Sequence, residues 1–178
     1  MATEELVNRL SVCPKGKKGW REFEDVCIDI LRFLFVPPLR NPRIQPRTLS
    51  GTERRDAIFA NRNMDTSNIW GQLRAELNAR FIVFEFKNYK KQKLTATEVD
   101  QLRNYLTGTI GNLGIICSTQ PPSKTALKRR NTVFTREEKV ILFLTSDDMK
   151  EMVYIKERGE DPADLIMDMV EEFYLQHE

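Results

Sequence analysis

Histidine is nearly absent from this sequence of 178 residues, in which His177 is the only one. Histidine is the most frequent general base in enzymes, the usual partner of serine and cysteine nucleophiles, and a common zinc ligand. The three cysteines are odd in number, lie far apart and include no C-x-x-C pair, which argues against a disulfide framework and against a cysteine zinc site. If the chain is an enzyme, carboxylates, lysine and a hard cation must therefore carry out its chemistry.

Long apolar runs and export signals are missing as well. No apolar run approaches the ~20 residues that cross a bilayer, and the N-terminus, MATEELVNRL, contains acids but no basic or apolar signal-peptide region. We therefore expect a cytoplasmic protein that has no membrane partner. The length suits one domain and no repeat is visible, so residues 1–178 are expected to form a single domain with an N-terminal extension over residues 1–18.

Positive charge is concentrated in three segments. The first, PPLRNPRIQPRTLSGTERR at residues 37–55, contains five arginines, one acid and four prolines, so it is expected to form a basic loop without regular structure. The other two segments contain Lys87, Lys90, Lys91 and Lys93, and Lys124, Lys128, Arg129 and Arg130. Such patches can bind along a phosphate backbone. For each patch taken alone, ordinary solvated surface charge explains the lysines and arginines equally well.

Apolar spacing predicts alternating helices and strands. The segment Trp20–Phe35 has its large apolar residues on one helical face, with Glu24 at the edge of that face. FIVFEFK at residues 81–87 is dense in β-branched and aromatic residues, which predicts a central strand buried on both faces. A shorter strand is expected within RRDAIFAN, where Asp56 and Ile58 share one face.

The second half of the sequence continues this alternation. Thr95 and Glu98 have the spacing of a capping box, which predicts the start of a helix that carries Gln101 and Tyr105 beside its buried face. The further expected elements are strands at 113–118 and 139–145, and helices at 123–138, from the cap Ser146 to near Gly159, and from Asp161 onward. The residues of the last helix expected to face inward are Leu165, Ile166, Met169, Val170 and Phe173. Residues 67–79 fit either a strand or a helical turn. The order predicts an α/β domain with a central mixed sheet flanked by helices.

An acid inside the central strand needs an explanation. Glu85 and Lys87 point to the same face, about 7 Å apart, and a buried carboxylate costs several kcal/mol unless it is paired or bound to a cation. A salt bridge with Lys87 is the simplest explanation. If the two strands pair, Asp56 lies beside Glu85, and the two carboxylates with the backbone carbonyl of Phe86 can hold Mg²⁺. Lys87 would then orient or help to deprotonate a water, an arrangement that suits phosphodiester hydrolysis without histidine.

These residues occur in a familiar order. Asp56 followed by Glu85-Phe86-Lys87 resembles the motif of the PD-(D/E)xK phosphodiesterase superfamily, to which many restriction endonucleases belong. The segment GWREFEDVCIDIL is similar to the first helix of Mrr-type restriction endonucleases, and the pair Gln101 and Tyr105 is similar to the Q-x-x-x-Y motif of the RecB-like nucleases. The resemblance extends from Gly19 to Leu106 and implies a restriction endonuclease-like fold.

The resemblance also implies a role for each matching residue. Asp56 and Glu85 correspond to metal ligands, Lys87 to the group that orients the water, and Gln101 to a residue that organises the catalytic site. Glu24, in the position of the acid of the family's F-E pair, is implied as a further ligand or as a carboxylate outside the ligand set. Contacts to nucleic acid are expected from Arg43, Arg47, Arg54, Arg55, Lys90, Lys91, Lys93 and Tyr105.

The implied activity is hydrolysis of DNA by an Mg²⁺-dependent endonuclease, with Mn²⁺ as a substitute cation and RNA as an open alternative, in antiviral defence or repair. Cutting both strands needs two sites, so a homodimer or larger assembly is expected, with recruitment by a sensor or targeting module. The alternatives are a catalytically inactive nuclease-like domain for nucleic-acid binding or assembly, and a junction resolvase. Arg55 stands where the family motif has a proline, and Asp25 and Asp65 are the alternative acids if the strands pair differently.

Overall fold

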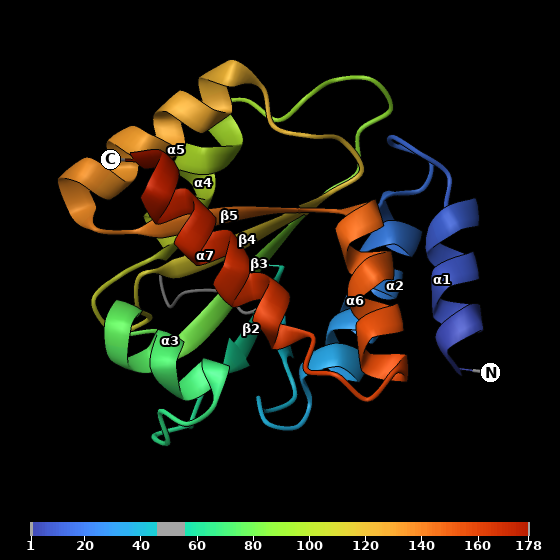
Figure 1. Ribbon diagram of the computed structural model, residues 1–178. Helices are drawn as coiled ribbons and strands as arrows, with labels where there is room; N and C mark the ends of the chain where they lie inside the picture. The colour runs from blue at the N-terminus through green and yellow to red at the C-terminus, as the bar shows by residue number, and fades with distance from the viewer. Residues whose placement is uncertain (1, 46–55, 178) are drawn as a thin grey trace.

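The segment predicted as the central strand, β3 (Phe81–Lys87), is the middle strand of a five-stranded mixed sheet (Figure 1). This computed structural model describes residues 2–45 and 56–177. Across the sheet the strands follow in the order β1 (Arg43–Ile44), β2 (Ala57–Ala60), β3, β4 (Leu113–Ser118) and β5 (Val140–Thr145). The pairs β1–β2 and β2–β3 are antiparallel, whereas β3, β4 and β5 are parallel. The predicted mixed sheet of an α/β fold is therefore confirmed.

Helices cover both faces of the sheet and give the molecule three layers (Figure 1). One face is covered by α2 (Trp20–Phe35), α3 (Ile69–Leu77), α6 (Ser146–Glu157) and α7 (Ala163–His177), and α1 (Ala2–Val12) packs outside α2 and α6. The other face is covered by α4 (Ala96–Tyr105) and α5 (Lys124–Glu137). A strand covered on both faces must be apolar on both, which explains the continuous apolar run of β3.

Two helices, α2 and α4, contribute side chains to the candidate site, and both begin where the sequence predicts. The predicted apolar face of α2 is buried, with 2% exposure or less at Phe23, Val26, Cys27, Ile30, Leu31 and Leu34. At the start of α4 the Glu98 carboxylate accepts hydrogen bonds from the Thr95 N–H (2.7 Å) and the Thr95 hydroxyl (2.8 Å). This capping box fixes where the helix begins and therefore which face Gln101 occupies.

Two helices were not assigned from the sequence. Residues expected to form an N-terminal extension contain α1, whose Leu6 and Leu10, one turn apart, are buried in the core beside α2. Residues that fitted either a strand or a helical turn form α3, which begins after its N-cap Asn68. The Asn68 side chain accepts a hydrogen bond from the N–H of Gly71 at 2.9 Å. Both helices depend on contacts with distant parts of the chain, which local periodicity does not reveal.

Two smaller corrections concern the expected basic loop and the start of α6. The loop contains the short strand β1, and its residues 46–55 lie outside the described residues. The cap of α6 is Thr145 and not Ser146, because the Thr145 hydroxyl accepts a hydrogen bond from the N–H of Asp148 at 3.2 Å.

The last helix, α7, follows Asp161 and Pro162 as predicted and packs Ile166, Val170 and Phe173 into the core. Leu165 and Met169, which were also expected to face inward, are only partly buried. No helix within residues 2–45 and 56–177 is long and apolar enough to cross a membrane.

Candidate active site

Asp56, which directly precedes β2, and Glu85 of the neighbouring β3 lie on the same side of the sheet. In the antiparallel ladder Ile58 pairs with Val83, so two residues further along Asp56 stands opposite Glu85. Side chains two residues apart on a strand point to the same face, and opposed side chains have Cβ atoms about 5 Å apart. The predicted pairing of these two strands, with both acids on one face, is confirmed.

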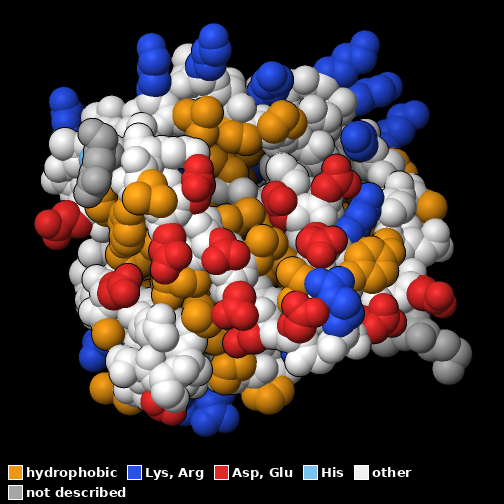
Figure 2. All heavy atoms as spheres, viewed as in Figure 1, with side chains coloured by type: hydrophobic (Ala, Val, Ile, Leu, Met, Phe, Trp, Pro, Cys, Tyr) orange, Lys and Arg blue, Asp and Glu red, His pale blue; other side chains and the backbone are white. Residues whose placement is uncertain are grey.

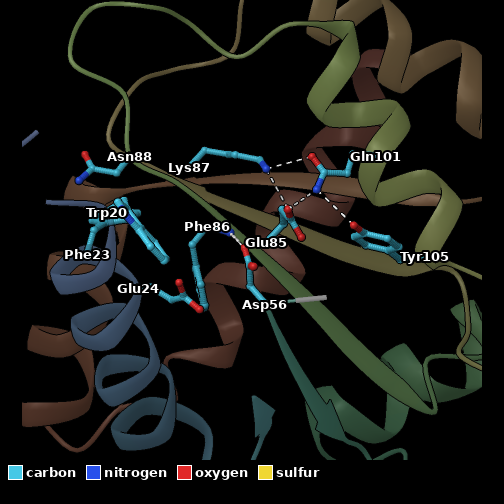
Figure 3. A pocket seen from close by; sticks show the side chains of 10 residues that line it. All are labelled: Trp20, Phe23, Glu24, Asp56, Glu85, Phe86, Lys87, Asn88, Gln101 and Tyr105. Atoms are coloured by element: carbon cyan, nitrogen blue, oxygen red, sulfur yellow. Dashed lines mark hydrogen bonds and ion pairs between the residues drawn. The ribbon is translucent and has the colours of Figure 1, made fainter. Parts of the chain in front are cut away.

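The backbone of Phe86 joins the two strands at this point. Its N–H donates a hydrogen bond of 2.8 Å to Oδ2 of Asp56 (Figure 3). The N–H and C=O of one residue in a strand point toward the same neighbouring strand, so the carbonyl of Phe86 faces the side of Asp56. This is the carbonyl that the sequence placed with the two acids as an oxygen donor.

A hydrogen-bonded network connects β3 to α4 beside the paired acids (Figure 3). Nζ of Lys87 donates to Oε1 of Glu85 at 2.8 Å and to Oε1 of Gln101 at 3.0 Å. Nε2 of Gln101 donates to the same Glu85 oxygen at 2.7 Å and to the hydroxyl of Tyr105 at 3.2 Å. Gln101 and Tyr105 are four residues apart and share one helical face, so the capped helix holds the amide and the phenol above the strand.

Burial makes the negative charge of Glu85 costly. The residue is 1% exposed, and its burial together with repulsion from the Asp56 carboxylate raises the pKa of Glu85 to about 7, against a smaller opposing effect of Lys87. The ion pair with Lys87, the simplest explanation for a buried acid, is present. It leaves Oε2 of Glu85 buried and without a hydrogen-bond partner among the described residues. This oxygen is therefore available to a proton or a cation.

These groups open into a pocket of about 460 Å³ (Figure 3). Seven residues predicted from the sequence line it, namely Glu24, Asp56, Glu85, Phe86, Lys87, Gln101 and Tyr105. Sequence reasoning missed Trp20, which lines the same pocket and is 45% exposed. The guanidinium carbon of Arg21 lies 5.1 Å from the centroid of the Trp20 ring. As the first residue of an amphipathic helix, Trp20 gave no signal that distinguishes a pocket wall from a core position.

Asn88 is a second lining residue that sequence reasoning missed. Its side chain accepts a hydrogen bond from the N–H of Gly16 at 3.1 Å and donates one to the carbonyl of Pro14 at 2.9 Å. It thereby fastens the segment before α2 to the end of β3. Its position directly after Lys87 was the available signal.

Glu24 lines the pocket from α2 and is 8% exposed. Its Oε1 accepts a hydrogen bond of 2.6 Å from Nε2 of Gln45. Among the residues that the structure describes, no three His, Cys, Asp or Glu side chains are grouped so that they could hold a metal ion together. The two roles predicted for Glu24, a further ligand or a carboxylate outside the ligand set, stay predictions.

The chain is similar to part of one curated protein. It is 34% identical over 112 residues to the "Putative transposon gamma-delta 80.3 kDa protein" of Escherichia coli (strain K12). The match covers 63% of this chain and 15% of that protein. No family model and no solved structure matches the chain.

The described lysines and arginine that were predicted to contact nucleic acid do not line this pocket. Arg43 is exposed on β1, and Lys90, Lys91 and Lys93 are exposed in the segment between β3 and α4. Three further predicted contacts, Arg47, Arg54 and Arg55, lie outside the described residues.

Two residues of the third basic cluster have structural partners. Nε of Arg129 lies 2.7 Å from Oδ1 of Asp100, and the guanidinium carbon of Arg130 lies 4.6 Å from the ring centroid of Phe173. Acidic side chains gather over α6 and α7 on the face turned to the viewer in Figure 2. A polyanion would be repelled from the area that these acids cover.

The alternative acids are not part of this site. Asp65 is exposed, and the N–H and hydroxyl of Ser67 donate to its carboxylate at 2.9 and 2.7 Å. Asp25 is exposed on α2, and neither residue lines the pocket. The choice of Asp56 as the partner of Glu85 is the one that the strand pairing supports.

Proposed function

We propose that this chain is a divalent-cation-dependent nuclease that hydrolyses phosphodiester bonds, with DNA as its preferred substrate. The observation that carries the proposal is the buried Glu85 beside the partly buried Asp56, in a pocket that Lys87 also lines. Oε2 of this glutamate has no hydrogen-bond partner among the described residues. A second carboxylate does not help a purely structural ion pair, because repulsion from Asp56 raises the pKa of Glu85 and disfavours its ionised form.

The donor set fits a hard cation such as Mg²⁺ or Mn²⁺. Asp56, Glu85 and the carbonyl of Phe86 offer oxygen atoms, which these ions prefer, and waters and substrate phosphate complete such sites. When bound, the cation acts as a Lewis acid on a phosphoryl oxygen and makes water a better nucleophile at neutral pH. Oε2 of Glu85 is buried without a hydrogen-bond partner among the described residues, so a cation beside it would stabilise the ionised carboxylate.

The side chains around these acids have separate tasks. Lys87 holds an ammonium group 2.8 Å from Oε1 of Glu85, where it can orient the attacking water and neutralise charge that develops on a phosphate. Gln101 keeps both groups in place, since its amide accepts from Lys87 and donates to Glu85. Tyr105 adds a hydroxyl at the same wall for a contact to substrate.

This function implies further properties that belong to the same proposal. The fold is of restriction endonuclease type, the protein acts in the cytoplasm on DNA in antiviral defence or repair, and a homodimer or larger assembly makes double-strand cuts. A sensor or targeting module recruits it. The similarity to part of a transposon protein does not decide between cutting and binding. The second candidate is an inactive nucleic-acid-binding domain, which the Lys87–Glu85 ion pair favours because it neutralises part of the buried charge.

Cleavage assays separate the two candidates. Purified protein is incubated with single- and double-stranded DNA and RNA in the presence of Mg²⁺, Mn²⁺ or EDTA. We expect cation-dependent cutting that EDTA abolishes, and losses of at least about 100-fold in Asp56→Asn and Lys87→Met. Asp65→Asn, which removes an exposed acid outside the pocket, is the matched control and should cut like wild type. Equal cutting by all variants would refute the assignment, and no cutting by wild type under any condition would favour the binding domain.

A further inference from the structure

Next to the candidate site, the outer part of the sheet is hollowed into a groove of about 620 Å³. Ile58 and Ala60 of β2 and Phe81 of β3 line it. These residues alternate with those that face α2 and α3, so they lie on the same face of the sheet as Glu85. On this face α4 lies over β3, β4 and β5 and α5 over β5, and the groove occupies the margin formed by β1 and β2.

Arginine dominates the lining of this groove. None of its ten lining residues is an acid, and half of them are arginines: Arg40, Arg43, Arg62, Arg74 and Arg80. Arg74 is partly buried and the other four are exposed. No ion pair within residues 2–45 and 56–177 includes any of the five. Five positive charges in a concave site, with no acid among the described residues that line it, attract an anion with several charges.

A buried asparagine gives the groove a fixed wall. Asn61 is 1% exposed, and its Nδ2 donates to the carbonyls of Trp70 at 2.8 Å and Ala79 at 3.1 Å. The backbone carbonyl of Asn61 accepts a hydrogen bond from Nη1 of Arg74. The wall that carries the guanidinium of Arg74 is therefore ordered before a ligand arrives, which lowers the entropy cost of binding.

The groove and the candidate active site are neighbours along β2 and β3. Asp56 in the pocket directly precedes β2 and is two residues from Ile58 in the groove, or about 7 Å. From Phe81 in the groove to Lys87 in the pocket, β3 spans roughly 20 Å. A nucleic-acid strand places one phosphate about every 3.4 Å along its axis, so roughly six phosphates could follow this path. A single phosphate or nucleotide would occupy only part of it.

We propose that the arginine groove binds the sugar–phosphate backbone of a polynucleotide and guides it toward the pocket of Asp56 and Glu85. The path into the pocket rests on the proposed nuclease function, whereas the binding itself does not. The chemistry that recognises the ligand is bidentate contact between guanidinium groups and phosphates. Because the contacts are to the backbone, binding should depend strongly on salt and little on base sequence.

Fluorescence anisotropy with a labelled DNA of about 20 nucleotides tests the groove in EDTA, where no cleavage can occur. The variant Arg62→Gln with Arg80→Gln removes two exposed charges and leaves Arg74 and Asn61 intact. We expect binding to weaken at least about tenfold. The slope of log K against log salt should decrease in magnitude by about 1.4 to 1.8, because each of the two lost phosphate contacts contributes roughly 0.7–0.9. The control, Arg32→Gln with Arg136→Gln on the exposed sides of α2 and α5, loses the same charge elsewhere.

Equal affinity and equal salt slope in the two double variants would overturn the proposal. Inorganic phosphate and poly-glutamate are added as competitors at the same concentration of charge as the DNA. If either displaces the labelled DNA, the assignment to a polynucleotide is overturned. Failure of wild type to cut DNA with Mg²⁺ would leave the binding result intact and would count against the nuclease function alone. If both proposals hold, the groove variant should raise KM for cleavage with little change in kcat.

Discussion

The buried carboxyl of Glu85 makes a quantitative prediction about stability in the absence of metal. Its pKa rises from an ordinary value of 4.5 to about 7 in the folded protein. Between these values the folded state binds more protons than the unfolded state, so stability falls as the pH rises. One pKa unit corresponds to about 1.4 kcal/mol, so the free energy of unfolding falls by roughly 3 kcal/mol between pH 4.5 and pH 7.

Glu85→Gln removes this dependence. A glutamine oxygen can still accept hydrogen bonds from Lys87 and Gln101, and the amide carries no charge at any pH. We therefore expect the variant to match wild type near pH 4.5 and to exceed its stability at pH 8 by about 3 kcal/mol. With an m-value of about 2 kcal/mol per molar urea, this difference moves the unfolding midpoint by more than about 1 M.

Urea unfolding in EDTA, followed by circular dichroism at both pH values, measures this effect. Glu5→Gln on the exposed face of α1 controls for the change in net charge. The reasoning would be refuted if Glu85→Gln gained no stability relative to wild type between pH 4.5 and pH 8, because Glu85 would then not be held in an environment that opposes its charge.

Two further predictions concern the elements that hold the site. Thr95→Ala removes the cap of α4, which should cost about 1 kcal/mol in unfolding free energy, with the exposed Thr97→Ala as control. Gly19→Ala should cost more than about 2 kcal/mol, because a Cβ there would lie 1.8 Å from the carbonyl oxygen of Pro14, whereas Gly108→Ala meets nothing within 4 Å. A Gly19→Ala protein whose Tm equals that of Gly108→Ala in thermal unfolding would contradict the close packing at the start of α2.

The elements of the candidate site were predictable from the sequence because their signals are local. The 3.6-residue spacing of α2, the apolar run of β3 and the capping box of α4 each lie within one segment. The pairing of Asp56 with Glu85 is a long-range contact that the sequence left as a condition, because side-chain alternation fixes the face of each acid and not which strands pair.

Other features depend on tertiary contacts that a single sequence does not display. The helix α3 was ambiguous because its Gly71 weakens a helical pattern, and the reason for that glycine is a close approach: a Cβ there would lie 1.8 Å from the carbonyl oxygen of Asp65. The arginine groove was not predicted, since Arg62, Arg74 and Arg80 belong to different segments that only the fold brings together. Gln45 lies beside Glu24 for the same reason.

Binding of a divalent cation tests the central claim most directly. Isothermal titration calorimetry with Mn²⁺ at pH 8 compares metal-free wild type with Asp56→Asn, and Asp65→Asn serves as the control for loss of an acid. Saturable binding to wild type and to the control, lost in Asp56→Asn, is the predicted result. No saturable binding to wild type, or equal binding to Asp56→Asn, would contradict the proposal that Asp56 and Glu85 hold a catalytic cation.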